Sequence, residues 1–365
     1  MNWMGLMIVC SFAIYPDLGA QTWKGTIVKQ GDMVVVKNPK NPMIPAASFR
    51  FKEEISISGG SLPPEAAFGI IRDVAVAADG RIYVAEIKQG KVLAFDSNGK
   101  FLFAFGKRGQ GPGEFSSPVQ ISVRNMRREV FVDGSRKGVV FDLEGKFKEN
   151  TIYPSAMLTV RSDEQGGLAG TIMDTSGPMG SYQLVKTGGG GSPPMILAKA
   201  PLPDLNAPDP FMPRLAWDLR PDGIVAEGLP ERYEIKIHDA AGKIIRQISR
   251  EYDPVPVTAR DEEEYLKTVP PEVAAATGKP RFSKRFPAFR RIVADERGWL
   301  FVQTNERASD GKSYITDIFD SDGRYVARFG EGGTIYRVCG GKIYAVVEDE
   351  EGDMILKRYS TEWQK

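Results

Sequence analysis

The sequence is poor in the residues that most catalytic and metal sites require. It contains a single histidine, His238, and two cysteines in 365 residues. One histidine excludes a zinc site built from several histidines, and a Ser-His-Asp or Cys-His arrangement would have to use His238. If the N-terminal segment is removed, Cys339 is the one cysteine left, so we expect no intramolecular disulfide.

An excess of charge is also missing. The 48 Lys and Arg side chains almost balance 47 Asp and Glu, for a net charge of +1. Proteins dedicated to nucleic-acid binding usually carry a strong basic excess, because neutralised phosphates dominate their affinity. The balance therefore argues against nucleic acid as a partner, including an intracellular RNA-binding role.

No hydrophobic run is long enough to span a bilayer. The apolar stretch from Met4 to Tyr15 has the length of a signal-peptide core, and Leu18-Gly19-Ala20 offers small residues for cleavage. No Lys or Arg precedes Lys24, which is unusual for such a leader. We expect residues 1–20 to be a signal peptide, and the mature protein to be secreted or periplasmic and monomeric.

One short phrase is repeated four times. It places an Asp and a Gly between two β-rich runs, where Asp accepts hydrogen bonds from backbone amides and Gly supplies a positive φ. Each copy therefore predicts a hairpin corner. The copies are Phe95–Lys100, Phe141–Lys146, His238–Lys243 and Phe319–Arg324.

A second phrase, an apolar strand, an Asp-Gly type turn and another apolar strand, occurs upstream of the first. We count six such units, each able to form four short strands, and this spacing is typical of a β-propeller. The sequence predicts an all-β, six-bladed β-propeller over residues 48–365, after an N-terminal extension at 21–47. A strand at 48–57 would pair with 354–359 and close the ring.

One segment departs from the β pattern. Thr258 can cap a turn rich in acidic residues, and Pro270-Pro271 can open a second short helix. We expect a short helical insertion at 257–277, between blades 4 and 5.

The glycine-rich loop Phe105–Pro118 resembles the inter-blade loop of NHL-repeat propellers, in which spaced glycines lead to Glu-Phe and then Pro. Phe329-Gly330-Glu331-Gly332-Gly333 is a weaker copy. The resemblance covers residues 65–150 well and 213–360 loosely, and it is greatest to secreted bacterial six-bladed propellers, many without an assigned activity. It implies a propeller fold and no particular reaction. Strands, rather than a strand and a helix, flank the loop, so a phosphate-binding role is disfavoured.

Two sets of charged residues are candidate sites. Acidic residues at strand ends could hold calcium, as in the gluconolactonase-like propellers that this alternative resembles; they are Glu86, Asp133 and Glu227, with Asp73 and Asp218 as further possibilities. Cations could instead bind an anionic or sugar-bearing ligand. These are Arg72 and the run that contains Arg281, Lys284, Arg285, Phe286, Phe289, Arg290 and Arg291.

Both sets also have a purely structural explanation. The acidic residues could be solvated side chains at the rim, and the basic residues could form charge pairs that hold blades together. His238 stands where Phe95, Phe141 and Phe319 stand in the other copies, so we expect a packed ring there rather than a catalytic one. The sequence thus favours a non-catalytic module, without a cofactor, that binds a protein or an anionic or sugar ligand. The alternative is a calcium-assisted hydrolase or lactonase.

Overall fold

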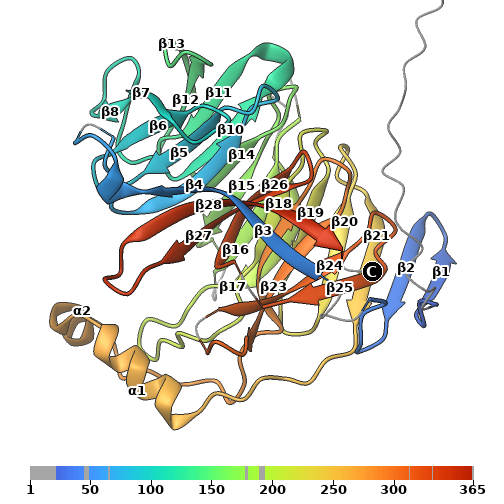
Figure 1. The fold of residues 1–365 in the computed structure, drawn as a ribbon. Helices are drawn as coiled ribbons and strands as arrows, with labels where there is room; N and C mark the ends of the chain where they lie inside the picture. The colour runs from blue at the N-terminus through green and yellow to red at the C-terminus, as the bar shows by residue number, and fades with distance from the viewer. Residues whose placement is uncertain are drawn as a thin grey trace, which may run out of the picture.

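The chain forms a ring of six β-sheets, the blades, each built on four antiparallel strands (Figure 1). The computed structural model describes residues 22–44, 49–64, 66–176, 180–188, 194–311, 313–330 and 332–363, so the predicted signal peptide lies outside the described residues. Blades 1, 2 and 3 are formed in chain order, each from four strands. Blade 1 contains β4 (Ile71–Val76), β5 (Ile82–Glu86), β6 (Lys91–Phe95) and β7 (Phe101–Phe105); blade 2 contains β10 (Gln120–Arg124), β11 (Glu129–Asp133), β12 (Gly138–Asp142) and β13 (Phe147–Thr151); blade 3 contains β14 (Met157–Ser162), β15 (Leu168–Asp174), β16 (Ser181–Lys186) and β17 (Met195–Pro201).

The remaining blades follow the same plan, and the six-bladed propeller predicted from the repeats is confirmed. The innermost strand of each blade is the first that the chain reaches after leaving the previous blade, whereas N-terminal strands are added at the outer edges of blades 4 and 6. Blade 4 contains β18 (Ala216–Leu219), β19 (Val225–Gly228), β20 (Glu234–His238) and β21 (Ile244–Arg250); blade 5 contains β22 (Phe289–Ala294), β23 (Leu300–Arg307), β24 (Tyr314–Phe319) and β25 (Tyr325–Phe329); blade 6 contains β26 (Thr334–Cys339), β27 (Lys342–Glu348), β28 (Met354–Trp363) and β3 (Phe49–Ser58).

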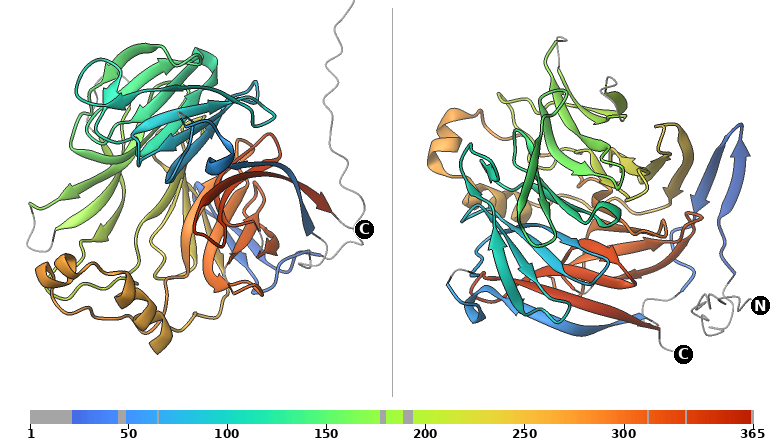
Figure 2. Two further views of the ribbon diagram at one scale, coloured as in Figure 1. Left: turned by 60° about the vertical axis from the view of Figure 1, so that its left-hand side comes forward. Right: turned by 90° about the horizontal axis from the view of Figure 1, so that it is seen from above.

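Ring closure occurs as the sequence predicts. Strand β3, which precedes blade 1 in the chain, pairs antiparallel with β28 and becomes the outermost strand of blade 6. The blue and red strands lie side by side in both views of Figure 2. Closure removes an open sheet edge that could otherwise recruit other chains.

The repeated Asp-Gly corners have the geometry that their residues predict. Asp96 Oδ1 accepts hydrogen bonds from the backbone amides of Asn98 at 2.8 Å and Lys100 at 2.9 Å, and Gly99 has a φ of 83°. Asp142 and Asp320 accept the same pair of bonds in blades 2 and 5. A side chain at Gly99 would be strained at this φ.

Register explains the place of His238. It pairs with Val225, as Phe95 pairs with Ile82, Phe141 with Val130 and Phe319 with Leu300. All four rings are buried, His238 at 2% exposure. The prediction of a packed ring at this position is therefore confirmed.

The N-terminal extension holds strands that the repeat pattern does not predict. β1 (Thr26–Gln30) and β2 (Met33–Asn38) form a hairpin, and β2 pairs parallel with β21, which extends blade 4 to six strands. The amides of Met43 and Ile44 then donate to Tyr325 and Val326 on the outer strand of blade 5. Together with β3, this N-terminal strap crosses the outside of blades 4, 5 and 6.

Two helices interrupt the ring between blades 4 and 5, as predicted. α1 (Ala259–Thr268) begins with a capping box between Thr258 and Asp261, and α2 (Pro271–Ala276) has a proline in its first turn. The helices and the β1–β2 hairpin lie on opposite sides of the molecule (Figures 1 and 2). No helix in the described ranges is long and apolar enough to cross a membrane.

Each seam between neighbouring blades has its own apolar core, and these cores are unequal. The seams between blades 4 and 5 and between blades 1 and 2 are rich in buried aromatic rings, including Phe289, Phe319 and Phe115. Phe115 ends the glycine-rich loop and is fully buried. The seam between blades 3 and 4 buries only Ala169, Leu184, Leu219 and Val225 among the described residues.

Candidate functional site

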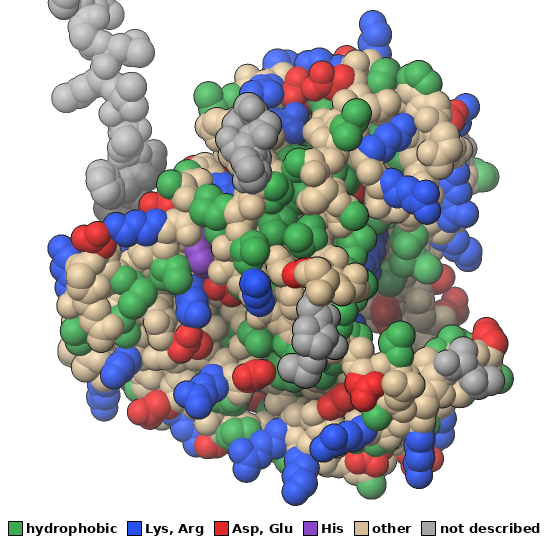
Figure 3. Space-filling view, turned by 180° about the vertical axis from the view of Figure 1, so that it is seen from behind, with side chains coloured by type: hydrophobic (Ala, Val, Ile, Leu, Met, Phe, Trp, Pro, Cys, Tyr) green, Lys and Arg blue, Asp and Glu red, His purple; other side chains and the backbone are tan. Residues whose placement is uncertain are grey.

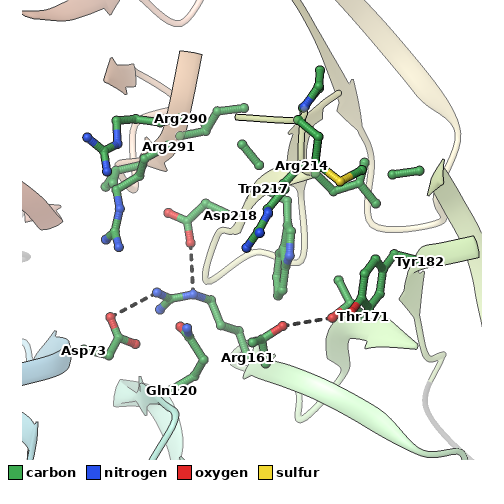
Figure 4. A pocket seen from close by; sticks show the side chains of 18 of the residues that line it. Asp73, Gln120, Arg161, Thr171, Tyr182, Arg214, Trp217, Asp218, Arg290 and Arg291 are labelled. Atoms are coloured by element: carbon green, nitrogen blue, oxygen red, sulfur yellow. Dashed lines mark hydrogen bonds and ion pairs between the residues drawn. The ribbon is translucent and has the colours of Figure 1, made fainter. Parts of the chain in front are cut away.

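A cavity of about 380 Å³ lies where the six innermost strands begin and continues into the thin seam between blades 3 and 4 (Figure 4). The connections from blade 3 to blade 4 and from blade 4 to blade 5 reach the ring at the same end, because each leads into an innermost strand. The charged residues in its wall are five arginines and two aspartates: Arg72, Arg161, Arg214, Arg290, Arg291, Asp73 and Asp218.

Arg161 forms the floor of this cavity, and we call it and its two acidic partners the channel network. Its Nη2 lies 3.1 Å from Asp73 Oδ1 of blade 1, and its Nε lies 3.4 Å from Asp218 Oδ1 of blade 4. All three side chains are buried. Burial alone would lower the pKa of Arg161, but the two carboxylates raise it, so the guanidinium stays charged.

Both aspartates also hold neighbouring blades together. Asp73 Oδ2 accepts the backbone amide of Ile121 in blade 2 at 3.0 Å, and Asp218 Oδ2 accepts that of Ala294 in blade 5 at 2.9 Å. Their oxygens therefore already have partners. They leave little negative charge to balance the other arginines of the wall.

Irregular pairing directs several of these side chains toward the channel. Register shifts in the innermost strands immediately precede Asp73, Arg161, Arg291 and Arg337. A bulge inserts a residue and can re-aim the side chain that follows. Beside Arg161, Thr159 adopts a φ of 51°, which is unusual for a β-branched residue and is typical of functional or strained sites.

Four of the five arginines form no ion pair with any residue that the structure describes: Arg72, Arg214, Arg290 and Arg291. Arg290 lies over the ring of Tyr314 at 4.1 Å, and Arg291 over that of Tyr336 at 4.6 Å. Burial lowers the pKa of Arg291, which means that its charge is held at a cost. The wall therefore carries an uncompensated positive charge.

The three carboxylates of the calcium alternative are not brought together. Glu86, Asp133 and Glu227 lie on β5, β11 and β19, which are second strands, whereas the channel is lined by first strands. Strand pairing makes Ile82, Val130 and Val225 equivalent positions in blades 1, 2 and 4. Counted from these residues, Glu86 is the fifth residue, Asp133 the fourth and Glu227 the third, so the three carboxylates lie at different levels along their strands. Among the described residues, no three His, Cys, Asp or Glu side chains gather as a metal site would require.

Each of the three carboxylates has its own partners instead. Glu86 accepts backbone amides of the loop around it, including Lys88 at 2.9 Å. Asp133 accepts the Tyr153 hydroxyl and the amide of Val160, both at 2.8 Å. Glu227 Oε1 lies 3.1 Å from His238 Nε2. These contacts give all three a structural explanation.

The aromatic and basic run before blade 5 divides into two parts. Arg290 and Arg291 line the cavity, together with Arg72, whereas Arg281, Lys284 and Arg285 do not. The earlier part of the run, residues 281–286, stabilises the helical insertion. Phe286 and Phe282 pack on Phe211, with ring centroids 4.8 and 5.8 Å apart, and Tyr265 of α1 contacts Phe211 and Phe282. Phe289 is fully buried in the core.

Figure 3 shows the surface hollowed between the helical insertion, at the lower right, and the blades above it. Positive and negative side chains are interspersed over the rest of this face. The insertion therefore stands beside an opening rather than covering a flat surface.

The sequence did not single out several wall residues that shape the site: Gln120, Arg161, Tyr182, Arg214 and Trp217. Blade 3 carries the least regular copy of the repeat, and Arg214 and Trp217 follow a Pro-rich connection without a recognisable motif. The signal that could have located Arg161 is its register: it falls on the innermost strand at the layer of Asp218 in blade 4.

Comparisons with known proteins agree with this architecture. A family model described as a 6-bladed beta-propeller matches residues 64–175, which include blades 1 and 2. No curated protein matches the chain by sequence. The finer NHL-repeat assignment stays a prediction.

Solved structures of low sequence identity share the fold. One is a Bacteroides fragilis protein whose name suggests export, with 11% identity, a TM-score of 0.57 and coverage of 91% of this chain and 100% of that one. A second is a Bacteroides vulgatus protein of the DUF4221 family, with 9% identity, a TM-score of 0.53 and coverage of 87% and 99%. A gluconolactonase of Xanthomonas campestris matches at 12% identity and a TM-score of 0.47, covering 83% and 89%.

Proposed function

We propose that this protein is an exported, non-catalytic binding protein that holds an anionic ligand in the cavity at the start of its innermost strands. The observation that carries the proposal is the charge of the wall. Five arginines face two aspartates, and both aspartates are engaged by Arg161 and by backbone amides. Arg291 donates to the Ile335 carbonyl at 3.2 Å, but an anion would supply the ion pairs that Arg72, Arg214, Arg290 and Arg291 lack among the described residues.

The scaffold suits binding without chemistry. The ring is closed by β3, and the channel network fixes the floor of the cavity. A preorganised site loses little freedom when a ligand binds, which favours affinity. A cavity of about 380 Å³ is within the usual range for small-molecule sites.

The proposal of export rests on the N-terminal sequence and on the similarity of the fold to one solved structure. The apolar leader at 1–20 is typical of a signal peptide, and one structure of the same fold has a name that suggests export. A secreted or periplasmic protein of this kind would meet small anions or acidic polymers outside the cytoplasm. We expect it to act as a monomer.

In the part of the chain that the structure describes, the carboxylates of the alternative, a calcium-assisted hydrolase or lactonase, do not converge. Its three proposed ligands lie on separate blades with their own partners. We therefore propose the binding role alone.

The experiment is a thermal-shift and calorimetric screen of the protein without its leader against inorganic phosphate, citrate and digalacturonate. We expect at least one anion to raise the unfolding midpoint, and the effect to weaken at high salt because charge pairing is screened. Arg72→Gln and Arg214→Gln should reduce binding.

Arg136→Gln is the matched control, because Arg136 is exposed in blade 2 and is absent from the cavity wall. It should leave binding unchanged. The proposal fails if no anion of the panel binds, or if the control weakens binding as much as the two pocket variants do.

A further inference from the structure

The polar groups of the cavity specify more than charge. Trp217 and Tyr182 also line the cavity, and neither the Trp217 indole N–H nor the Tyr182 hydroxyl has a hydrogen-bond partner among the described residues. Gln120 Oε1 is buried without a partner as well. The wall thus offers two free donors and a free acceptor beside its arginines.

Unpartnered polar groups at a binding site favour ligands that complete them. A buried acceptor such as Gln120 Oε1 gains most from a donor that enters with the ligand, because leaving it unpaired costs free energy. An ionised carboxylate has only acceptors, so carboxylates alone can satisfy the arginines but not Gln120. A hydroxyl can donate to Gln120 and accept from Trp217 or Tyr182.

The arginines lie on two sides of the cavity. In Figure 4, Arg290 and Arg291 lie on one side of Asp218, and Arg214 lies on the other side, next to Trp217. The side chains come from separate segments: Arg214 from the connection to blade 4, and Arg290 and Arg291 from the beginning of blade 5. A ligand that contacts both sides needs two acidic groups joined by a spacer.

The spacer would lie against Trp217. This side chain is partly exposed in the cavity, while part of it packs on the small apolar core of the seam between blades 3 and 4. Aromatic faces provide a flat contact for the C–H faces of a ring, and the indole edge provides a donor. A hydroxylated ring would match these groups better than a bare alkyl chain or an aromatic acid.

From this combination we infer that the ligand is an acidic saccharide, at least two uronate-like residues long. Its sugar ring lies on Trp217, its hydroxyls pair with Gln120 and Tyr182, and its carboxylates pair with Arg214 and with Arg290 and Arg291. The inference rests on the proposed anion-binding function and adds the ligand class.

The test compares four probes by calorimetry: digalacturonate, its dimethyl ester, maltose and citrate. The ester keeps the shape of digalacturonate without its charge, maltose is a neutral disaccharide, and citrate carries carboxylates without a ring. We expect digalacturonate to bind more tightly than citrate by about tenfold, because its sugar rings offer a face for Trp217 and several hydroxyls, whereas citrate has no ring and one hydroxyl. The ester and maltose should bind far more weakly.

Variants separate the two contributions. Gln120→Leu and Trp217→Phe should weaken digalacturonate binding several-fold and citrate binding less, because citrate has a single hydroxyl and no ring, whereas Arg214→Gln should weaken both. Trp217→Phe keeps an aromatic side chain on the seam, so it avoids the folding defect that Trp217→Ala could cause. Arg136→Gln again serves as the control.

The outcomes are distinguishable. Citrate binding that equals or exceeds digalacturonate binding, with loss in Arg214→Gln, would leave anion binding intact and overturn the saccharide. Equal binding of the ester would also overturn it, because the carboxylates would then play no part. Failure of both anions to bind would remove the proposed function together with this inference.

Discussion

Arg161 of blade 3 reaches across the channel to Asp73 of blade 1, with 3.1 Å between Nη2 and Oδ1, although blade 2 stands between them in the ring. The same guanidinium lies 3.4 Å from Asp218 of blade 4. One side chain therefore connects three blades at the axis, while the apolar cores connect them only in neighbouring pairs.

Replacing Arg161 by Met should strongly destabilise the fold. The substitution leaves two buried carboxylates without their cation, and breaking a buried ion pair in this way typically costs about 3–5 kcal/mol. Urea denaturation at neutral pH measures the free energy of unfolding directly.

The control for Arg161 is Arg260→Ala on α1. Arg260 pairs with Glu264 but is 85% exposed, so its loss should change the free energy of unfolding by no more than about 0.5 kcal/mol. Equal effects of the two substitutions would contradict the structural role of the channel network.

Blade 4 has a buried polar pair, His238 and Glu227, where other blades have an apolar pair. In blades 1, 2 and 5 a phenylalanine stands diagonally opposite a valine on the second strand, whereas blade 4 has His238 and Glu227 at these positions. The His238 ring and the Glu227 carboxylate are 3.1 Å apart and both buried.

His238→Phe alone should therefore be costly, because it leaves the Glu227 carboxylate buried without a partner; we expect a loss of about 2–4 kcal/mol. His238→Phe with Glu227→Val restores the pair found in the other blades and should recover most of that loss. A double-mutant cycle in urea measures the coupling. Additive effects of the two substitutions would show that the residues do not act as a pair.

The repeats predicted the fold because their chemistry is local. The hydrogen bonds that Asp96 accepts and the left-handed conformation of Gly99 depend only on residues within one hairpin corner. Because the corners repeat, the position of His238 could be predicted from its counterparts in the other copies. Ring closure followed from the alternation in β3. The short spacing between these features leaves few other arrangements.

The candidate site depends on distant residues, and here the sequence predicts less. Arg72, Arg290 and Arg291 were identified because each stands at the beginning of an innermost strand, and all three line the cavity. Arg161 and Arg214 were missed because a bulge and an irregular connection direct them there. Glu86, Asp133 and Glu227 were grouped because each follows an apolar strand, but the observed strand pairing places them at different levels along their strands.

The hairpin β1–β2 was missed for a similar reason, since its parallel pairing with β21 joins segments about two hundred residues apart. Asn38 fixes its end. The Asn38 amide donates to the carbonyls of Ser249 at 3.1 Å and Gly323 at 2.9 Å, and its oxygen accepts the Tyr325 amide at 2.7 Å.

Asn38→Leu should lower the free energy of unfolding by about 2–4 kcal/mol, because it leaves several buried polar groups without partners. Thermal and urea unfolding measure the loss. Asn98→Ala is the comparison, since the Asn98 side chain is exposed in a hairpin corner, and it should be nearly neutral. A neutral Asn38→Leu would mean that the N-terminal strap adds little to stability.

Glu129 provides a pH-dependent test within blade 2. Its carboxylate lies 2.6 Å from Lys148 Nζ and 3.3 Å from the buried Arg124 Nη1. Burial alone would raise the pKa of Glu129, but the hydrogen bonds from Lys148 and Arg124 outweigh it, and the pKa is lowered. A carboxyl whose folded pKa lies below its unfolded value stabilises the fold above the unfolded pKa, about 4.3, and loses this contribution as the pH falls through the folded pKa.

Glu129→Gln should therefore be less stable than the parent protein by about 2 kcal/mol at pH 7, and the difference should shrink steadily below about pH 4.5. Urea denaturation at pH 7, 5, 4 and 3 follows the difference directly. Glu144→Gln, which removes a carboxyl that is 59% exposed in the same blade, should show a small difference at every pH. A Glu129→Gln deficit that is the same at pH 3 as at pH 7 would show that packing, and not the lowered pKa of the carboxylate, accounts for the stability that Glu129 contributes.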